Sequence, residues 1–153
     1  MNYIFAIEKF KDIKVELIAL MQYHYAEMSE RLVRDGFEVS PFDMDIKTYE
    51  ELNDAGHLLI YTVRLCGTLI GYSNIYITQD MHNSDLMAQE DCLYIRRDCR
   101  KGVGKELVKY CLADLKARGM KYLDVTAMTD LRVAKIWKRM GFKELAVKMR
   151  YTF

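Results

Sequence analysis

The sequence predicts a single α/β domain with a mixed, twisted sheet flanked by helices, and three observations support this. The chain has 153 residues, which is the length of one domain and enough to bury a core. Its composition, with 51% hydrophobic and 29% charged residues, is that of a globular protein. Apolar residues recur at strand spacing in some stretches and helix spacing in others, in the order βααββ–βαβαβ. Because no linker or repeat interrupts this order, we expect one domain over residues 1–153.

The first part of the chain predicts one strand and two helices. Tyr3 to Ile7 is a candidate strand. Apolar residues then recur at helical spacing up to about Arg34, after which Gly36 ends the helix. A loop containing the single proline leads to a short helix in residues 46–56. Two helices in succession separate the first strand from the rest of the sheet.

The middle of the chain predicts three further strands. Residues 58–65 and 68–78 alternate as strands, and Cys66-Gly67 is a turn between them. Polar residues follow and predict a loop, after which Asp91 to Arg96 is another strand. A hairpin and an adjoining strand therefore form the centre of the expected sheet.

The last part predicts strand–helix–strand units. Gly102 to Arg118 is the strongest helix prediction, because its apolar residues form one stripe and a glycine follows it. Residues 121–127 alternate as a strand. Thr129 or Asp130 can cap a final helix that ends at another glycine. Residues 142–153 are expected to finish the sheet as a strand.

Charge and cysteine usage exclude several classes of protein. The net charge of +1, from 23 basic and 22 acidic residues, gives no general attraction to nucleic acid or to an anionic membrane. Charges interrupt every apolar run before it reaches membrane-spanning length. No export signal and no CxxC or other metal-ligand spacing is present, so we expect a cytoplasmic protein with reduced thiols and no metal site. The four cysteines are Cys66, Cys92, Cys99 and Cys111.

The stretch CRKGVGKEL, between a strand and the strongest helix, has the features of an anion-binding turn. A helix amino end presents unpaired N–H groups and partial positive charge. Gly102 and Gly104 would let phosphates approach the backbone, and Arg100, Lys101 and Lys105 would add charged hydrogen bonds. The alternative is a plain strand-to-helix connection with solvated lysines, because short glycine patterns recur by chance.

Known phosphate-binding and deaminase motifs do not match this stretch. A P-loop requires Ser or Thr after Gly-Lys, and Glu106 stands there. A Rossmann fingerprint requires a small residue where Leu107 stands. The HxE and PCxxC motifs of zinc deaminases are absent.

What the stretch resembles is the coenzyme motif of the GNAT acyltransferase family, in which a strand of the form LYV runs into an R-x-x-G-x-G turn and a helix. Here the corresponding segments are LYI, residues 93–95, and RKGVGKEL, residues 100–107. The segment AKIWKRMGF, residues 134–142, is similar to the family's later A-x-x-x-Y-x-x-x-G-F segment, and the element order agrees over nearly the whole chain. The middle of the chain is similar to GNAT proteins common in phage and prophage genomes.

The resemblance implies an N-acetyltransferase that moves an acetyl group from acetyl-CoA directly to an amine acceptor. The turn would bind the coenzyme pyrophosphate and the preceding strand would pair with the pantetheine amides. The implied coenzyme-binding residues are Leu93, Tyr94, Ile95, Arg100, Lys101, Gly102, Val103, Gly104 and Lys105. The acceptor cannot be identified from the sequence, and a homodimer is left open because the family uses many dimer modes.

Two positions depart from the family pattern. The turn reads R-x-G-x-G, so Arg100 lies one residue closer to the glycines than usual. Trp137 stands where the family often has a tyrosine general acid, and indole cannot supply a proton near neutral pH. These departures motivate an alternative, a catalytically inactive GNAT-fold module that acts by binding a partner protein. Nucleic-acid binding through the two basic stretches is a weaker alternative.

Candidate catalytic residues are Glu90, Asp91 and Tyr151. Acetyl transfer requires a base whose pKa is near the working pH, and Glu90 or Asp91 precedes the expected coenzyme strand. Tyr151 would be a relocated proton donor if the last strand passes the leaving thiolate. His82 in a polar loop and His24 on the first helix are weaker candidates, since such histidines are more often solvated or packed.

Overall fold

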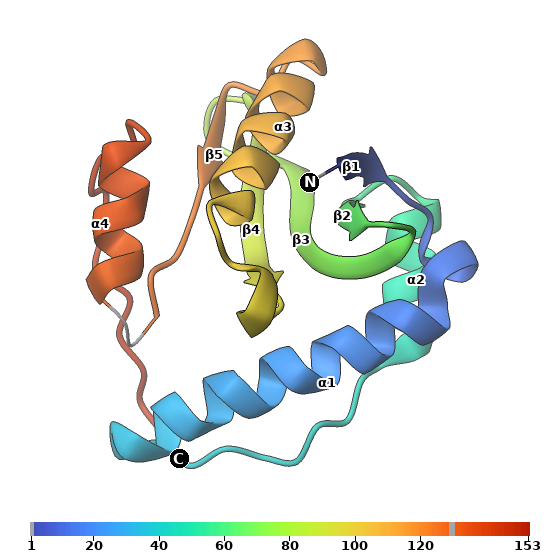
Figure 1. The fold of residues 1–153 in the computed structure, drawn as a ribbon. Coiled ribbons are helices and arrows are strands. Elements are labelled where there is room, and N and C mark those ends of the chain that lie inside the picture. The colour runs from blue at the N-terminus through green and yellow to red at the C-terminus, as the bar shows by residue number, and fades with distance from the viewer. Residues whose placement is uncertain (1, 129–130) are drawn as a thin grey trace.

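One five-stranded mixed sheet forms the centre of the computed structural model, which describes residues 2–128 and 131–153 (Figure 1). The sheet order is β1-β2-β3-β4-β5, with β1 to β4 antiparallel and β5 parallel to β4. The strands are β1 Tyr3–Ile7, β2 Leu58–Leu65, β3 Thr68–Gln79, β4 Leu86–Ile95 and β5 Tyr122–Asp124. This is the single-domain α/β architecture with a mixed sheet that the sequence predicts.

Helices cover both faces of the sheet. The helices are α1 Phe10–Arg34, α2 Ile46–Asp54, α3 Val103–Ala117 and α4 Leu131–Arg139, and Arg97–Cys99 forms a short 3-10 helix. Apolar residues of α1 and α2 pack with one core cluster, which includes Tyr72 and Tyr94 of the sheet. The stripe of α3 packs with the other, which includes Tyr61 and Ile95. Because successive residues of a strand face opposite ways, Tyr94 and Ile95 mark the two faces where β4 ends.

A buried amide joins the helices of the first face. The N–H of Phe10, the first residue of α1, donates to Asn53 Oδ1 at 2.9 Å, and Asn53 Nδ2 donates to the Leu58 carbonyl at 2.8 Å. Asn53 thereby satisfies an otherwise unpaired donor at the start of α1. One residue of α2 thus fixes α1 relative to the beginning of β2.

Gly71 of β3 pairs with Ile95 at the end of β4 and leaves no room for a side chain between the two strands. A Cβ atom at Gly71 would lie 2.3 Å from Ile95 Cδ1 and 2.8 Å from the Tyr94 carbonyl oxygen. Glycine is therefore required for this close approach. The position of the β4 end, where the turn to α3 begins, depends on it.

Strand β4 departs from the prediction at its start. It begins at Leu86, five residues before the expected Asp91, so part of the predicted polar loop is strand. A bulge between Asn74 and Ile75 of β3 leaves Asp91 without a partner, and it changes the alternation of β4. Ala88 packs on the α3 side, whereas Cys92 packs on the α1 side. The alternation seen in the sequence therefore could not extend across this point.

The end of the chain also departs from the prediction. β5 is only three residues long, against the expected 121–127. The prediction of a last strand over residues 142–153 is wrong, because that segment forms no strand and its apolar side chains from Leu145 onward are exposed. It runs from α4 toward the end of α1, where the Arg150 guanidinium lies 5.6 Å from the centre of the Phe37 ring (Figure 1). The predicted caps Thr129 and Asp130 lie outside the described residues.

Among the residues described, none of the helices is both long and apolar enough to cross a membrane.

Candidate active site

The turn before α3 leaves two backbone donors free. Gly102 adopts the left-handed conformation, with φ of 85°, and α3 begins at the next residue. The N–H groups of Lys101, Gly102 and Lys105 already donate within the turn, to the carbonyls of Cys99, Arg100 and Gly102. In the described part of the chain, the N–H groups of Val103 and Gly104 have no hydrogen-bond partner. These two donors, at the start of a 15-residue helix, suit an anion.

The side chains around the turn favour the same ligand. Lys101 and Lys105 are exposed and flank the free donors. A Cβ at Gly104 would meet only Ile95, at 3.5 Å, so the space above this residue is open to a ligand. The residues present therefore fit a pyrophosphate group, held by two amides and two lysines.

The outer edge of β4 is open beside this turn. β5 pairs only with Met87 to Gln89 of β4, and it ends at Asp124. Beyond this point β4 continues to Ile95, and no described strand pairs with it on that side. The predicted segment Leu93 to Ile95 thus has backbone groups on which an extended chain with amide groups can pair.

Glu90 lies where β5 parts from β4. Its side chain is buried, with 7% of the residue exposed, and its Oε2 accepts a hydrogen bond from the Thr126 N–H at 3.4 Å. Burial raises the pKa of Glu90 to about 7, although the Thr126 bond opposes the shift. A carboxyl group with a pKa near neutral pH is suited to take a proton from an amine.

Asp91, the residue left unpaired at the bulge, belongs to the opposite face. Although the residue as a whole is exposed, its carboxylate is partly desolvated, and this raises its pKa, whereas Lys148 opposes the shift. The same carboxylate contributes to the raised pKa of Tyr49 and of Tyr76, which lie on the α1 and α2 side. The two predicted carboxylates, Glu90 and Asp91, therefore serve different faces of the sheet.

Arg100 does not point toward the free amides. Its Nη2 donates to Glu27 Oε2 of α1 at 2.7 Å, and its Nε donates to the Ile95 carbonyl at 2.8 Å. The guanidinium also lies over the Tyr94 ring, 5.3 Å from its centre. No local pattern in the sequence indicates the contact with Glu27, because the two residues are 73 positions apart.

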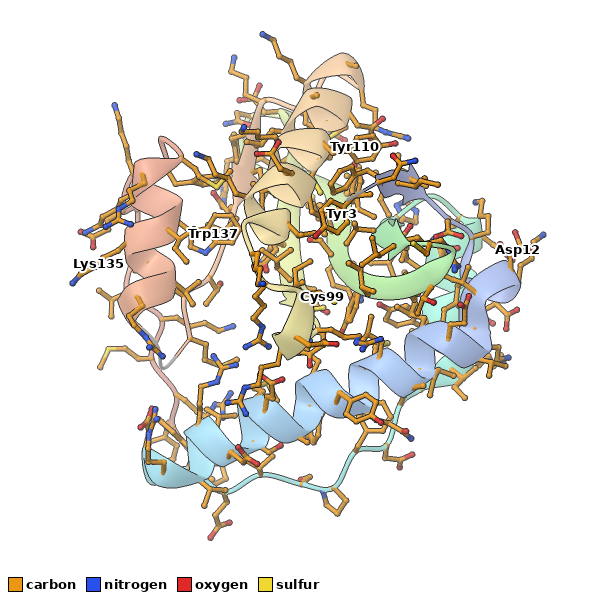
Figure 2. All side chains as sticks on the ribbon, in the orientation of Figure 1. Tyr3, Asp12, Cys99, Tyr110, Lys135 and Trp137 are labelled. Carbon is orange, nitrogen blue, oxygen red and sulfur yellow. The ribbon has the colours of Figure 1, made fainter. Side chains whose placement is uncertain are left out.

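The other predicted residues lie away from Glu90. Tyr151 is 81% exposed and packs edge-on against Phe153, 5.1 Å between ring centres. His82 is exposed in the hairpin between β3 and β4. Trp137 points from α4 toward the sheet and α3 (Figure 2) and packs against Phe142, 5.0 Å between ring centres. Its buried indole N–H has no partner in the described part of the chain.

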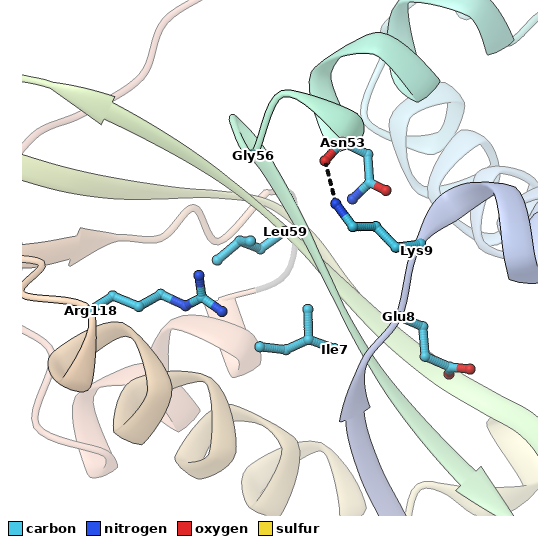
Figure 3. Close-up of a pocket in the computed structure, with 7 residues that line it drawn as sticks. All are labelled: Ile7, Glu8, Lys9, Asn53, Gly56, Leu59 and Arg118. Atoms are coloured by element: carbon cyan, nitrogen blue, oxygen red, sulfur yellow. Dashed lines mark hydrogen bonds between the residues drawn. The ribbon is translucent and has the colours of Figure 1, made fainter.

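A cavity of about 210 Å³ lies elsewhere, between the start of β2 and the ends of β1 and α3 (Figure 3). Lys9, Arg118 and Asn53 line it, and Lys9 Nζ donates to the Asn53 carbonyl at 3.3 Å. None of the predicted site residues contributes to it. The candidate site is instead formed by the turn before α3 and the open edge of β4, because the free amides, the unpaired strand edge and Glu90 lie there.

Comparison of the chain with protein families gives one match. The model described as the acetyltransferase (GNAT) family matches residues 20–142, which include β4, the turn and α4. No curated protein matches the chain significantly.

Solved structures share the fold at low sequence identity. An aminoglycoside acetyltransferase from an uncultured soil metagenomic sample aligns with a TM-score of 0.75 and 17% identity, over 99% of this chain and 96% of its own. A ribosomal-protein-alanine N-acetyltransferase from Brucella melitensis gives 0.74 and 17%, over 100% of both chains. Glucosamine-6-phosphate N-acetyltransferase from Arabidopsis thaliana gives 0.71 and 14%, over 100% and 99%. None of these lends support to the phage-type subgroup.

Proposed function

Because the chain belongs to the GNAT acetyltransferase family, we propose that it transfers an acetyl group from acetyl-CoA directly to an amine acceptor. GNAT acetyltransferases are acyltransferases that use acetyl-CoA as the donor. The observation that carries the proposal is the position of Glu90, a buried carboxyl group with a pKa of about 7 at the point where β4 becomes open. A base there adjoins the edge expected to hold the thioester.

The donor would be held by backbone groups and two lysines. The free N–H groups of Val103 and Gly104, with Lys101 and Lys105, would bind the pyrophosphate. The open edge of Leu93 to Ile95 would pair with the pantetheine amides. The sequence prediction assigned the backbone of residues 101–105 and the Arg100 side chain to the pyrophosphate. The proposal keeps two of these amides and leaves Arg100 out, because its guanidinium is paired with Glu27.

In the proposed reaction the acceptor nitrogen attacks the thioester carbonyl carbon, and the C–S bond breaks as the C–N bond forms. Glu90 takes the proton that the nitrogen loses, directly or through water. The leaving thiolate cannot take a proton from Trp137, because an indole N–H does not ionise near neutral pH. Solvent would supply that proton, because the last strand on which the role of Tyr151 depended does not form and Tyr151 is exposed.

The acceptor nitrogen would approach the open edge of β4, where Glu90 lies. The three similar structures named above act, by their descriptions, on an aminoglycoside, an alanine of a ribosomal protein and glucosamine-6-phosphate. All three are amines.

Calorimetric titration with acetyl-CoA, followed by an amine panel, tests the proposal. Micromolar binding that requires the pyrophosphate is expected, with free pantetheine as the control ligand. A Gly104→Glu variant should lose this binding with its circular dichroism unchanged, because a carboxylate would occupy the open space above the two free amides. Unchanged binding in this variant would remove the turn from the site.

The second candidate function is an inactive GNAT-fold module that binds a partner protein, and Trp137 is the observation that favours it. Acetyl transfer to any amine of the panel excludes this alternative. Membership of the phage-type subgroup stays a prediction from the sequence.

A further inference from the structure

Three side chains lock α1 to the loop that precedes the donor turn. Glu27 of α1 accepts two hydrogen bonds, one from the Tyr94 hydroxyl at 2.8 Å and one from Arg100 Nη2 at 2.7 Å. Arg100 in turn donates to the Ile95 carbonyl and covers the Tyr94 ring. We name Glu27, Tyr94 and Arg100 the α1 clamp. It closes the loop of residues 96–100 onto the end of β4.

His24 and Tyr72 pack beside the α1 clamp and contact Tyr94 or its neighbours. The His24 ring stacks on Tyr94, 4.8 Å between ring centres, and His24 Nδ1 is 2.8 Å from the Tyr72 hydroxyl oxygen. Glu27 is half-buried, and although burial opposes ionisation, the hydrogen bonds from Arg100 and Tyr94 lower its pKa overall. Glu27 is therefore ionised at neutral pH and attracts the guanidinium.

The guanidinium and the free amides lie on different sides of the sheet. Tyr94, beneath the guanidinium, belongs to the core cluster of α1. Val103, which carries one of the free N–H groups, packs with Ile95 in the core cluster of α3. Contact between Arg100 and a pyrophosphate at these amides would require the ion pair with Glu27 to break first.

We infer that Glu27 is a positioning residue for coenzyme binding, which acts by holding Arg100 and, through it, the loop that leads to the free amides of Val103 and Gly104. Arg100 then holds the loop before the turn in place, through its hydrogen bonds to Glu27 and to the Ile95 carbonyl, and does not contact the phosphates. The inference rests on the proposed function for the identity of the ligand. It differs from the sequence prediction, in which Arg100 binds the pyrophosphate.

A double-mutant cycle with coenzyme A as the titrant separates the two roles of Arg100. If Arg100 acts through the clamp, Glu27→Ala and Arg100→Ala should each raise the Kd about tenfold, and the double variant should be no weaker than either single one. The KM for acetyl-CoA should rise in parallel while kcat stays nearly constant. If Glu27→Ala leaves the affinity unchanged or tightens it while Arg100→Ala weakens it, Arg100 binds the phosphates and the inference is overturned.

An ion pair in the same loop provides the matched control. Asp98 accepts from Arg96 Nη2 at 2.6 Å, and neither residue contacts α1 through this pair. Asp98→Ala should leave the Kd for coenzyme A unchanged. A loss equal to that of Glu27→Ala would mean that any disturbance of the loop weakens binding, which overturns a specific role for Glu27.

Amide hydrogen exchange of residues 96–104 tests the clamp without the coenzyme. We expect faster exchange there in Glu27→Ala and in Arg100→Ala than in the unmodified chain, with exchange in β2 unchanged. Equal exchange in all three proteins overturns the inference. If the unmodified chain does not bind coenzyme A, the proposed function fails, and the exchange experiment still decides whether the clamp orders the turn.

Discussion

At the residue scale, burial of the Glu90 side chain disfavours its ionised form and raises its pKa to about 7, a value suited to a general base at neutral pH. Replacement by Gln keeps the shape and the acceptor for the Thr126 N–H but removes the base. We expect the acetyl transfer rate to fall at least about 100-fold, with binding of acetyl-CoA unchanged. In the unmodified chain the rate should rise with pH up to about 7, as Glu90 ionises, and then level off. Steady-state kinetics from pH 5 to 9 measure this rise of the rate with pH. If Glu90→Gln shows the same rise, another residue is the base.

The same residue makes a prediction for stability. Burial raises the pKa of Glu90 from its ordinary value of 4.5 to about 7 in the folded chain, so the folded state binds the proton more tightly. This contribution to the free energy of unfolding is present below pH 4.5 and is lost as the pH rises through 7. Glu90→Gln should therefore be more stable than the unmodified chain at pH 8, by about 3 kcal/mol. Urea unfolding at pH 8 measures the difference, and a less stable variant would contradict it.

His24 has the opposite effect in acid. Burial, together with the positive charge of Arg31, lowers its pKa from 6.5 to about 4. Between these values the unfolded chain binds the proton and the folded chain does not, so stability falls as the pH falls through this window. His24→Gln retains a hydrogen-bonding group for Tyr72 but no titration. We expect the unmodified chain to lose about 2 kcal/mol more than the variant between pH 7 and 4.5, measured by urea unfolding. Equal losses would show that another group causes the acid sensitivity.

At the element scale, two glycines near the end of β4 have different roles. Gly71→Ala would place a Cβ 2.8 Å from the Tyr94 carbonyl, a backbone atom that cannot move freely, so we expect a loss of about 2 kcal/mol in the free energy of unfolding. Gly104→Ala, the matched control, adds the same methyl group at an ordinary contact distance of 3.5 Å and should leave the stability nearly unchanged. Calorimetric melting of both variants compares them directly. Equal destabilisation would refute the close approach at Gly71.

The spacing of apolar residues predicted most helices and strands, and it failed where polar residues or a bulge interrupt that spacing. The bounds of β1 and β2 are those expected, and α3 begins within one residue of its prediction, because alternation, stripe and glycine stops all lie in those segments. The start of β4 was missed since polar residues and a bulge interrupt its alternation. The turn sequence predicted unpaired N–H groups at the start of α3, but not which of them are free. The sequence did not predict the α1 clamp, because the pairing of Glu27 with Arg100 depends on how α1 crosses the sheet.

At the scale of the whole molecule, the candidate site is assembled where three parts meet. The sheet supplies an open edge, α3 supplies two free donors on one face, and α1 holds the intervening loop from the other face. Each part buries its own apolar surface in one of the two core clusters. The polar contacts of the clamp therefore connect the two core clusters at the turn. This is the route by which Glu27, as we infer, would act on a ligand bound at α3.

The last segment of the chain makes the final prediction. Apolar residues alternate from Leu145 to Phe153, and their side chains are between 81% and 112% exposed. Because none of these side chains is buried, deletion of residues 143–153 should change the free energy of unfolding by no more than about 0.5 kcal/mol. The exposed pair Lys138–Glu144, lost in the deletion, contributes little. Urea unfolding of both chains at the same pH measures the change.

Association between copies is the second readout of that deletion. An exposed row of apolar side chains in an extended segment favours pairing with another chain. We therefore expect the complete chain to form a homodimer at micromolar concentration and the shortened chain to be monomeric, as measured by sedimentation equilibrium. A shortened chain that is still dimeric would show that another surface makes the contact between copies.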